Sequence, residues 1–191
     1  MQFVSRKYTI SGITPLIMHA DELANPLSPL KKKMGQLSSQ RKKTDEVHEE
    51  MAKIEWLAGL YHDENGVFVP GINLEASIRD AAKLQRLGKE SVRSLRVEEE
   101  KAPLEYKGPK DVMKLADLPA FRDVRSVVVQ RARVMRCRPI FREWKCQFTV
   151  VVDADRLDVE QVDGFIETAG LMIGIGDFRP RYGRFMVEGV G

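Results

Sequence analysis

The stretch FREWKCQFTVVVD, residues 141–153, decides the fold that this sequence predicts. Within it every second residue is apolar over nine positions, namely Trp144, Cys146, Phe148, Val150 and Val152. The opposite face carries the polar side chains of Glu143, Lys145, Gln147 and Thr149. A period of two with one apolar face is typical of an antiparallel strand that is buried on one side. We therefore expect a half-buried strand here.

The preceding stretch, RSVVVQRARVMRCR at residues 125–138, also has strand character. Its apolar face switches after Val134, where Met135 and Cys137 follow Val128 and Ala132. A β-bulge changes the facing of a strand in this way, so we interpret residues 125–138 as one bulged strand. We expect this strand to be joined to the next at Pro139-Ile140.

Strands and helices follow one another around these segments in a regular order. Residues 2–10 and 184–190 read as strands, and apolar residues recur at helical spacing after Thr44, after the Pro70-Gly71 break and after Asp158. This order predicts an α+β fold: a ferredoxin-like or RRM-like antiparallel sheet with helices on one face. We expect a single domain over residues 1–191, with residues 15–62 as a partly helical insertion.

Several classes of protein are disfavoured by composition. No apolar run is long enough to span a bilayer, and the N-terminus reads as a strand without a signal core, so we expect a cytoplasmic protein without a membrane partner. Two cysteines and three scattered histidines do not form a metal motif, so we expect no metal and no cofactor.

The net charge is only +3, but the charges are segregated. Residues 31–43 hold six basic residues and no acid, and residues 122–145 hold eight basic residues against Asp123 and Glu143. Segregated positive charge attracts a polyanion, and arginine suits phosphate because it can donate two parallel hydrogen bonds. The candidate nucleic-acid-binding residues here are Lys31, Lys32, Lys33, Arg41, Lys42, Lys43, Arg131, Arg133, Arg136, Arg138 and Arg142. Only Glu143 lies close in sequence to neutralise the five arginines.

A glycine- and arginine-rich stretch, GIGDFRPRYGRF at residues 174–185, lies between the last expected helix and the last expected strand. We expect Gly174 and Gly176 to end the helix, as glycines commonly do. The side chains left to reach a phosphate backbone are those of Arg179, Arg181 and Arg184, with Tyr182 as a ring on which a base could stack. We expect Trp144 and Phe185 to be core residues.

Two motifs together resemble the RAMP superfamily, the RRM-like proteins of CRISPR effector complexes. FVPGINLEASIRDAAK, residues 68–83, resembles the element in which a strand turns through Pro-Gly into the first helix. GLMIGIGDFRPRYGRF, residues 170–185, resembles the C-terminal glycine-rich loop of that family. The resemblance implies that Asn73 lies where the turn approaches the nucleic-acid strand. The stretches NPLSPLKKK, QRKKTDEVHEE and RPIFREW, at residues 25–33, 40–50 and 138–144, also resemble a group of small bacteriophage proteins, and this resemblance implies a bacterial host cytoplasm.

Our leading hypothesis is a protein without enzymatic activity that binds single-stranded DNA or RNA and assembles along it, by self-association or within a multi-subunit complex. One alternative is a RAMP-type endoribonuclease, for which Tyr182 and His19 are the candidate catalytic residues. Another is a phage structural or inhibitory protein that mimics a subunit of a host complex. In that case the arginines would meet an acidic protein surface instead of phosphate.

Overall fold

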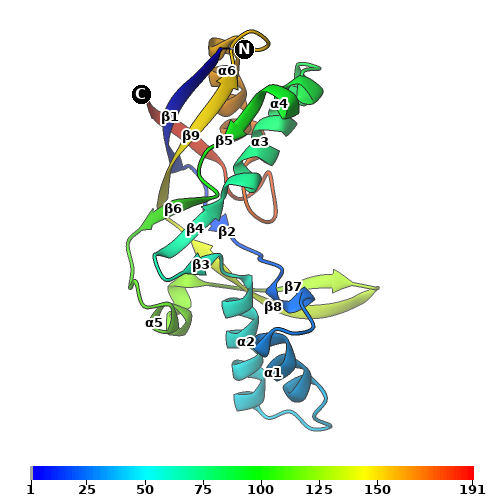
Figure 1. Ribbon diagram of the computed structural model, residues 1–191. Helices are drawn as coiled ribbons and strands as arrows, with labels where there is room; N and C mark the ends of the chain where they lie inside the picture. The colour runs from blue at the N-terminus through cyan, green and yellow to red at the C-terminus, as the bar shows by residue number, and fades with distance from the viewer. Residues whose placement is uncertain (1) are drawn as a thin grey trace. The chain divides into compact units, whose positions relative to one another are not determined.

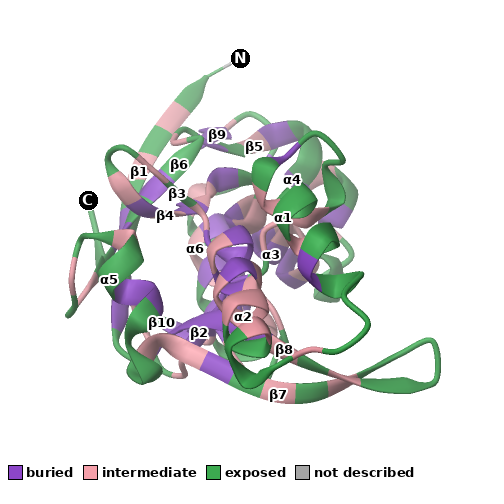
Figure 2. Cartoon of the chain, turned by 90° about the horizontal axis from the view of Figure 1, so that it is seen from below, coloured by how far each residue is buried: buried purple, intermediate pink, exposed green. Residues whose placement is uncertain are grey.

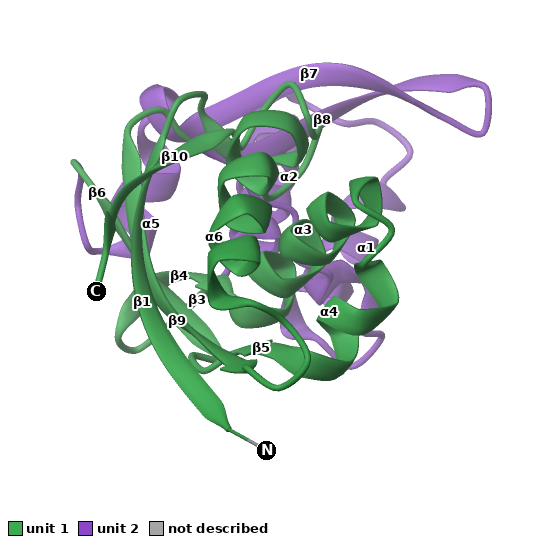
Figure 3. Cartoon of the chain, turned by 90° about the horizontal axis from the view of Figure 1, so that it is seen from above, with its two compact units in different colours: residues 1–16, 62–107, 141–191 green, residues 17–61, 108–140 purple. Residues whose placement is uncertain are grey.

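The computed structural model describes residues 2–191, and contacts within the chain divide it into two compact units (Figure 3). Unit 1 comprises Met1–Leu16, His62–Lys107 and Phe141–Gly191, and unit 2 comprises Ile17–Tyr61 and Gly108–Ile140. The expected insertion, residues 15–62, nearly coincides with the first segment of unit 2. Between residues 2 and 191, no helix is long and apolar enough to cross a membrane.

Unit 1 is built on one antiparallel sheet in the order β10-β1-β9-β6-β4-β3, with β5 also paired to β9 (Figure 1). The strands are β1 (Phe3–Gly12), β3 (His62–Asp63), β4 (Gly66–Pro70), β5 (Leu95–Val97), β6 (Lys101–Tyr106), β9 (Trp144–Asp153) and β10 (Phe185–Val190). If β5 and β6 are counted as one interrupted strand, the inner order β10-β1-β9-β5 is that of a ferredoxin-like sheet. The α+β, RRM-like fold class predicted from the sequence is confirmed.

Strand β9 lies in the middle of this sheet, and its predicted facing is confirmed. Trp144, Cys146, Phe148, Val150 and Val152 are all buried. On the neighbouring strand β1, Tyr8 is fully buried, and its ring stacks on that of Phe148 with centroids 5.7 Å apart. The alternating pattern arises because this one face of the sheet is covered by helices while the other is not.

Helices α3 (Gly71–Leu84) and α6 (Val159–Thr168) carry the apolar residues that cover this face, and α4 (Gly88–Ser94) follows α3. Helix α6 begins where the sequence predicts, because the Asp158 carboxylate accepts a hydrogen bond from the Glu160 N–H at 3.0 Å. A π-helical turn, η3 (Ala169–Ile173), continues α6. It rotates the last residues out of the apolar stripe, which leaves Met172 58% exposed.

Unit 2 contains helices α1 (Pro29–Ser38), α2 (Asp45–Gly59) and α5 (Val112–Asp117) and a three-stranded sheet in the order β2-β8-β7. Its strands are β2 (Leu16–Ile17), β7 (Arg122–Val129) and β8 (Ala132–Phe141), and two short 3-10 turns, η1 (Glu22–Ala24) and η2 (Pro119–Phe121), complete it. The indole of Trp56 on α2 is fully buried and donates to the Phe121 carbonyl oxygen at 2.7 Å. This bond ties α2 to the segment that enters β7.

The expected bulged strand over residues 125–138 is wrong, because the chain reverses there into the hairpin β7–β8. Gln130 and Arg131 form its two-residue turn with φ of 47° and 69°. Such turns usually carry Asn, Asp or Gly, and the sequence has none of these at the turn. The sequence pattern alone therefore indicates a change of face and gives no signal for a reversal of the chain. The expected joint at Pro139-Ile140 is also wrong: β8 continues through both residues to Phe141, and the chain turns at Arg142 and Glu143.

Candidate nucleic-acid interface

The glycine-rich loop, residues 174–184, follows η3 and closes on its own backbone. Gly174, Gly176 and Gly183 have φ of 77°, 77° and 72°, in the left-handed region that favours glycine. The Ile175 N–H donates to the Gly183 carbonyl oxygen at 2.9 Å, which draws the two ends of the loop together. A Cβ at Gly183 would lie 1.7 Å from the Ile175 carbonyl oxygen, so this closure requires glycine.

Helix α3 holds the beginning of the loop. The buried Ser77 hydroxyl donates to the Gly174 carbonyl oxygen at 2.8 Å. The Arg179 guanidinium donates to the same carbonyl at 3.5 Å and lies 3.9 Å from the Asp80 carboxylate. The structure thus brings the two motifs of the RAMP resemblance into contact. The sequence interpretation missed Ser77, although a serine within the apolar stripe of Leu74 and Ile78 was a usable signal.

The Asp80 carboxylate also accepts hydrogen bonds from Lys83 at 2.8 Å and from Arg79 at 3.2 and 3.3 Å. Burial acts to raise the pKa of Asp80, but the bonds from Lys83 and Arg79 outweigh it and hold the pKa below its ordinary value. Asp80 is therefore ionised at neutral pH and faces the loop as an anion.

The predicted residues of the loop differ in exposure. Arg181 is exposed, and the Arg179 side chain is 35% exposed. Tyr182 is half-buried, with its ring edge-on to Phe178 at 6.4 Å between centroids. Arg184 is half-buried, and its backbone N–H donates to the Thr14 hydroxyl at 3.0 Å. Asn73 is half-buried in the first turn of α3.

The predicted arginines of hairpin β7–β8 fall into two groups, one exposed and one paired or buried. The tip of the hairpin is coloured as exposed in Figure 2. Arg131 in the turn and Arg133 at the start of β8 are both exposed. Arg136 instead forms an ion pair with Glu55 of α2 at 2.7 Å, and Arg138 is only 9% exposed and lies opposite Asp123 in the ladder. The expectation that only Glu143 neutralises these arginines is wrong, because Glu55 comes from a helix distant in sequence. We therefore exclude Arg136 and Arg138 from the interface.

The remaining basic candidates lie at the surface. Arg142 is exposed in the bend between β8 and β9. The lysines of α1 and the following loop lie in unit 2, where Lys33 forms an ion pair with Glu50 at 2.7 Å and the Lys43 ammonium donates to the Gln40 carbonyl oxygen at 3.0 Å. The others are exposed, namely Lys31, Lys32, Arg41 and Lys42.

The side chains that could serve an endoribonuclease lie in different parts of the structure. His19 is exposed and lines a cavity of about 270 Å³ in unit 2, together with Asp21. Both thiols are buried, which raises the pKa of Cys137 to about 11 and that of Cys146 to about 12, so neither is a nucleophile at neutral pH. Within residues 2–191, no group of three or more potential metal ligands is assembled. Cleavage of RNA through His19 or Tyr182 stays a prediction.

The sheet order, the helices on one face and the glycine-rich loop between the last helix and the last strand define a ferredoxin-like, RRM-like α+β fold. No protein-family model matches the sequence, and no curated protein matches it. Among solved structures, the chain is similar to a chain in the cryo-EM structure of the Type III-B Cmr-beta bound to cognate target RNA. The TM-score is 0.57 at 13% sequence identity. The match covers 100% of this chain and 60% of that one, and at this identity it shows the fold alone.

Proposed function

We propose that this chain is a non-enzymatic protein that binds single-stranded nucleic acid, with RNA as the preferred ligand, and that copies of it assemble along the strand. The observation that carries the proposal is a set of exposed arginines for which residues 2–191 provide no carboxylate partner, namely Arg131, Arg133, Arg142 and Arg181. Neighbouring arginines are neutralised inside the fold. Exposed arginines that form no ion pair with a carboxylate are available to bind phosphate.

RNA is preferred because the similar solved chain belongs to a structure bound to target RNA. Single strands are preferred because the loop combines Arg181 with the exposed ring of Phe178 and the half-buried ring of Tyr182, and such a combination of cation and ring holds unpaired bases.

Assembly is supported by apolar side chains on one face of the β7–β8 hairpin. Val124, Val128 and Met135 are 58%, 66% and 60% exposed, and the register of the ladder places all three on the face that carries Arg133. Monomeric proteins rarely leave such side chains together on a surface unless it contacts another molecule. This face is the one we assign to contacts between copies along the strand.

The test is a double charge reversal at the hairpin turn, Arg131→Glu with Arg133→Glu. The affinity for a fluorescent single-stranded RNA, followed by anisotropy, should fall, and the slope of log affinity against log salt should flatten by about 0.7 for each lost phosphate contact. Unfolding should not change, because neither side chain is packed.

The matched control is Lys110→Glu with Lys114→Glu, which makes the same charge change at exposed positions in and beside α5 of the same unit. Equal losses in the two variants would show a non-specific effect of net charge and would contradict the assignment. Absence of binding by the unmodified protein at low salt would overturn the proposed function itself.

A further inference from the structure

The hairpin β7–β8 of unit 2 extends beyond helices α1 and α2, and its two edges differ (Figure 1). On the β8 edge, the Cys137 N–H donates to the Glu55 carboxylate at 2.8 Å, so α2 satisfies a group that a further strand would otherwise bind. This N–H therefore points away from Val124, which lies opposite Cys137 on β7. The sheet order β2-β8-β7 leaves β7 at the end, with no other strand beside it among residues 2–191.

The turn of the hairpin identifies the backbone groups on the β7 edge. A two-residue turn is closed by a pair that exchanges both backbone bonds, and this pair is Val129 with Ala132. Bonded pairs alternate along an antiparallel ladder, so the N–H and C=O groups of Val124, Ser126 and Val128 point away from β8. Within residues 2–191, no backbone bond outside the hairpin engages these groups.

The side chains along this edge suit the addition of a strand. Val124, Ser126 and Val128 are exposed and uncharged, and their register with β8 contains no bulge. Arg125 extends from the opposite face, where it forms an ion pair with Asp123. Proteins protect edge strands with charges, prolines or bulges, because an open edge is a template for another strand. The three outward residues of β7 carry none of these protections.

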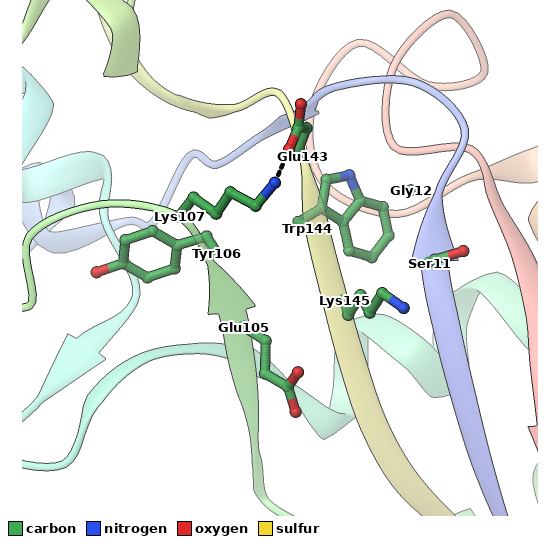
Figure 4. A pocket seen from close by; sticks show the side chains of 8 residues that line it. All are labelled: Ser11, Gly12, Glu105, Tyr106, Lys107, Glu143, Trp144 and Lys145. Atoms are coloured by element: carbon green, nitrogen blue, oxygen red, sulfur yellow. Dashed lines mark ion pairs between the residues drawn. The ribbon is translucent and has the colours of Figure 1, made fainter.

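The exposed strand positions of unit 1 are charged instead. Glu105 of β6 lies opposite Lys145 of β9, and Lys107 and Glu143 form an exposed ion pair at 3.3 Å beside them (Figure 4). The Lys145 ammonium also lies 2.7 Å from the carboxylate of Glu188 on β10, the strand at the end of that sheet. Charged side chains of this kind discourage the addition of a strand. The edge of β7 therefore differs in kind from that of β10.

We propose that β7 pairs with β7 of a second copy of this chain across a two-fold axis. The inference rests on the proposed function, which assigns this hairpin to contacts between copies, and it names the contact. In an antiparallel register centred on Ser126, Val124 of each copy lies opposite Val128 of the other, and the two Ser126 residues face each other. Every outward N–H and C=O of these residues then has a partner. The edge is complementary to itself in this register, because no two like charges are opposed.

A two-fold contact closes after two copies, so the pair is the unit that assembles along the strand. The pairing uses the edge of β7 alone. Arg131 lies in the turn and Arg133 on β8, so both arginines remain available to phosphate. Pairing of the hairpins is therefore compatible with binding of nucleic acid by the same hairpins.

The first experiment places a charge at the two-fold axis and measures mass by size-exclusion chromatography with light scattering, without nucleic acid. We expect the unmodified protein to form dimers. Ser126→Lys and Ser126→Glu should each raise the dimer dissociation constant roughly ten-fold or more, because two like charges face each other. An equimolar mixture of the two variants should dimerise again, since opposite charges then meet. Ser39→Lys, the same change at an exposed position beside α1, is the control and should stay dimeric.

The second experiment is a crosslink at the same position. Opposed residues that exchange backbone bonds have Cα atoms about 5.5 Å apart, a separation that a disulfide spans. Ser126→Cys should therefore form a disulfide-linked dimer in oxidised glutathione, whereas Ser39→Cys should not. The native Cys137 and Cys146 are buried, so they do not contribute to the crosslink.

The outcomes separate this inference from the proposed function. A protein that stays monomeric and binds single-stranded RNA would overturn the pairing of β7 while the proposed function stands. A dimer that persists in both charge variants, or that Ser126→Cys fails to link, would overturn the pairing as well. Dimers that dissociate in the charge variants, formed by a protein that binds no RNA, would leave the pairing standing and overturn the proposed function.

Discussion

The glycine-rich loop and the β7–β8 hairpin are both rich in arginine, but the fold treats them differently. The loop is held by its own backbone and by Ser77 and Asp80 of α3, so its arginines are placed by a rigid support. The hairpin ends in an exposed two-residue turn, and ion pairs lie toward its base, where Arg136 pairs with Glu55 and Arg125 with Asp123. A basic stretch of sequence therefore divides into arginines that stabilise the fold and arginines that remain available to a ligand.

The largest effect is expected from Gly183→Val in the loop. The new Cβ would overlap the Ile175 carbonyl oxygen, and a branched residue is poorly accommodated at φ of 72°. We expect a loss of at least about 2 kcal/mol in the free energy of unfolding, measured by urea denaturation. Gly189→Val in β10 is the control, because no atom lies within 4 Å of a Cβ built there. Similar losses in the two variants would show that loop closure does not depend on Gly183.

A smaller effect is expected at the base of the hairpin. Arg136→Ala removes the ion-pair partner of Glu55, whose side chain is only 16% exposed, and leaves that carboxylate with the Cys137 N–H at 2.8 Å. We expect a loss of about 1–3 kcal/mol in the free energy of unfolding. RNA affinity should not change.

Arg133→Ala is the matched variant on the same strand. Its side chain is exposed and makes only a 3.5 Å contact with the Ser126 hydroxyl, so stability should change by no more than about 0.5 kcal/mol while RNA affinity falls. If Arg136→Ala weakened RNA binding as much as Arg133→Ala without loss of stability, the division of the hairpin arginines would be wrong.

The sequence predicts those elements correctly whose apolar period or capping residues lie within a short stretch of the chain. Strand β9, helix α6 with its Asp158 cap and the glycines after the helix, Gly174 and Gly176, all follow from patterns within about fifteen residues. The hairpin was missed because Gln130 and Arg131 adopt left-handed conformations without the residues that usually signal them. In that case the tertiary structure overrides the local preference.

The candidate site was predictable only in part, because charge neutralisation depends on residues that are distant in sequence. Arg136 and Glu55 are 81 positions apart, and Ser77 and Gly174 are 97 apart. Nothing in the stretch RSVVVQRARVMRCR distinguishes Arg133 from Arg136, since both alternate with apolar residues. Only the packing of α2 against one of them makes the difference.

Within the loop, a smaller effect than that of Gly183→Val is expected from Asp80→Asn, which tests whether charge or backbone holds the loop. Burial acts to raise the pKa of Asp80, but hydrogen bonds from Lys83 and Arg79 outweigh it and hold the pKa below its ordinary value in the folded protein. The ion pairs of Asp80 therefore stabilise the fold above the unfolded pKa. That contribution is lost as pH falls through the folded value. Urea denaturation should show a difference from the unmodified protein of no more than about 1 kcal/mol at pH 7, because the partners are partly exposed. This difference should disappear in acid below the folded pKa and shrink in high salt. A difference as large as that of Gly183→Val would mean that the anion, and not the glycine backbone, orders the loop.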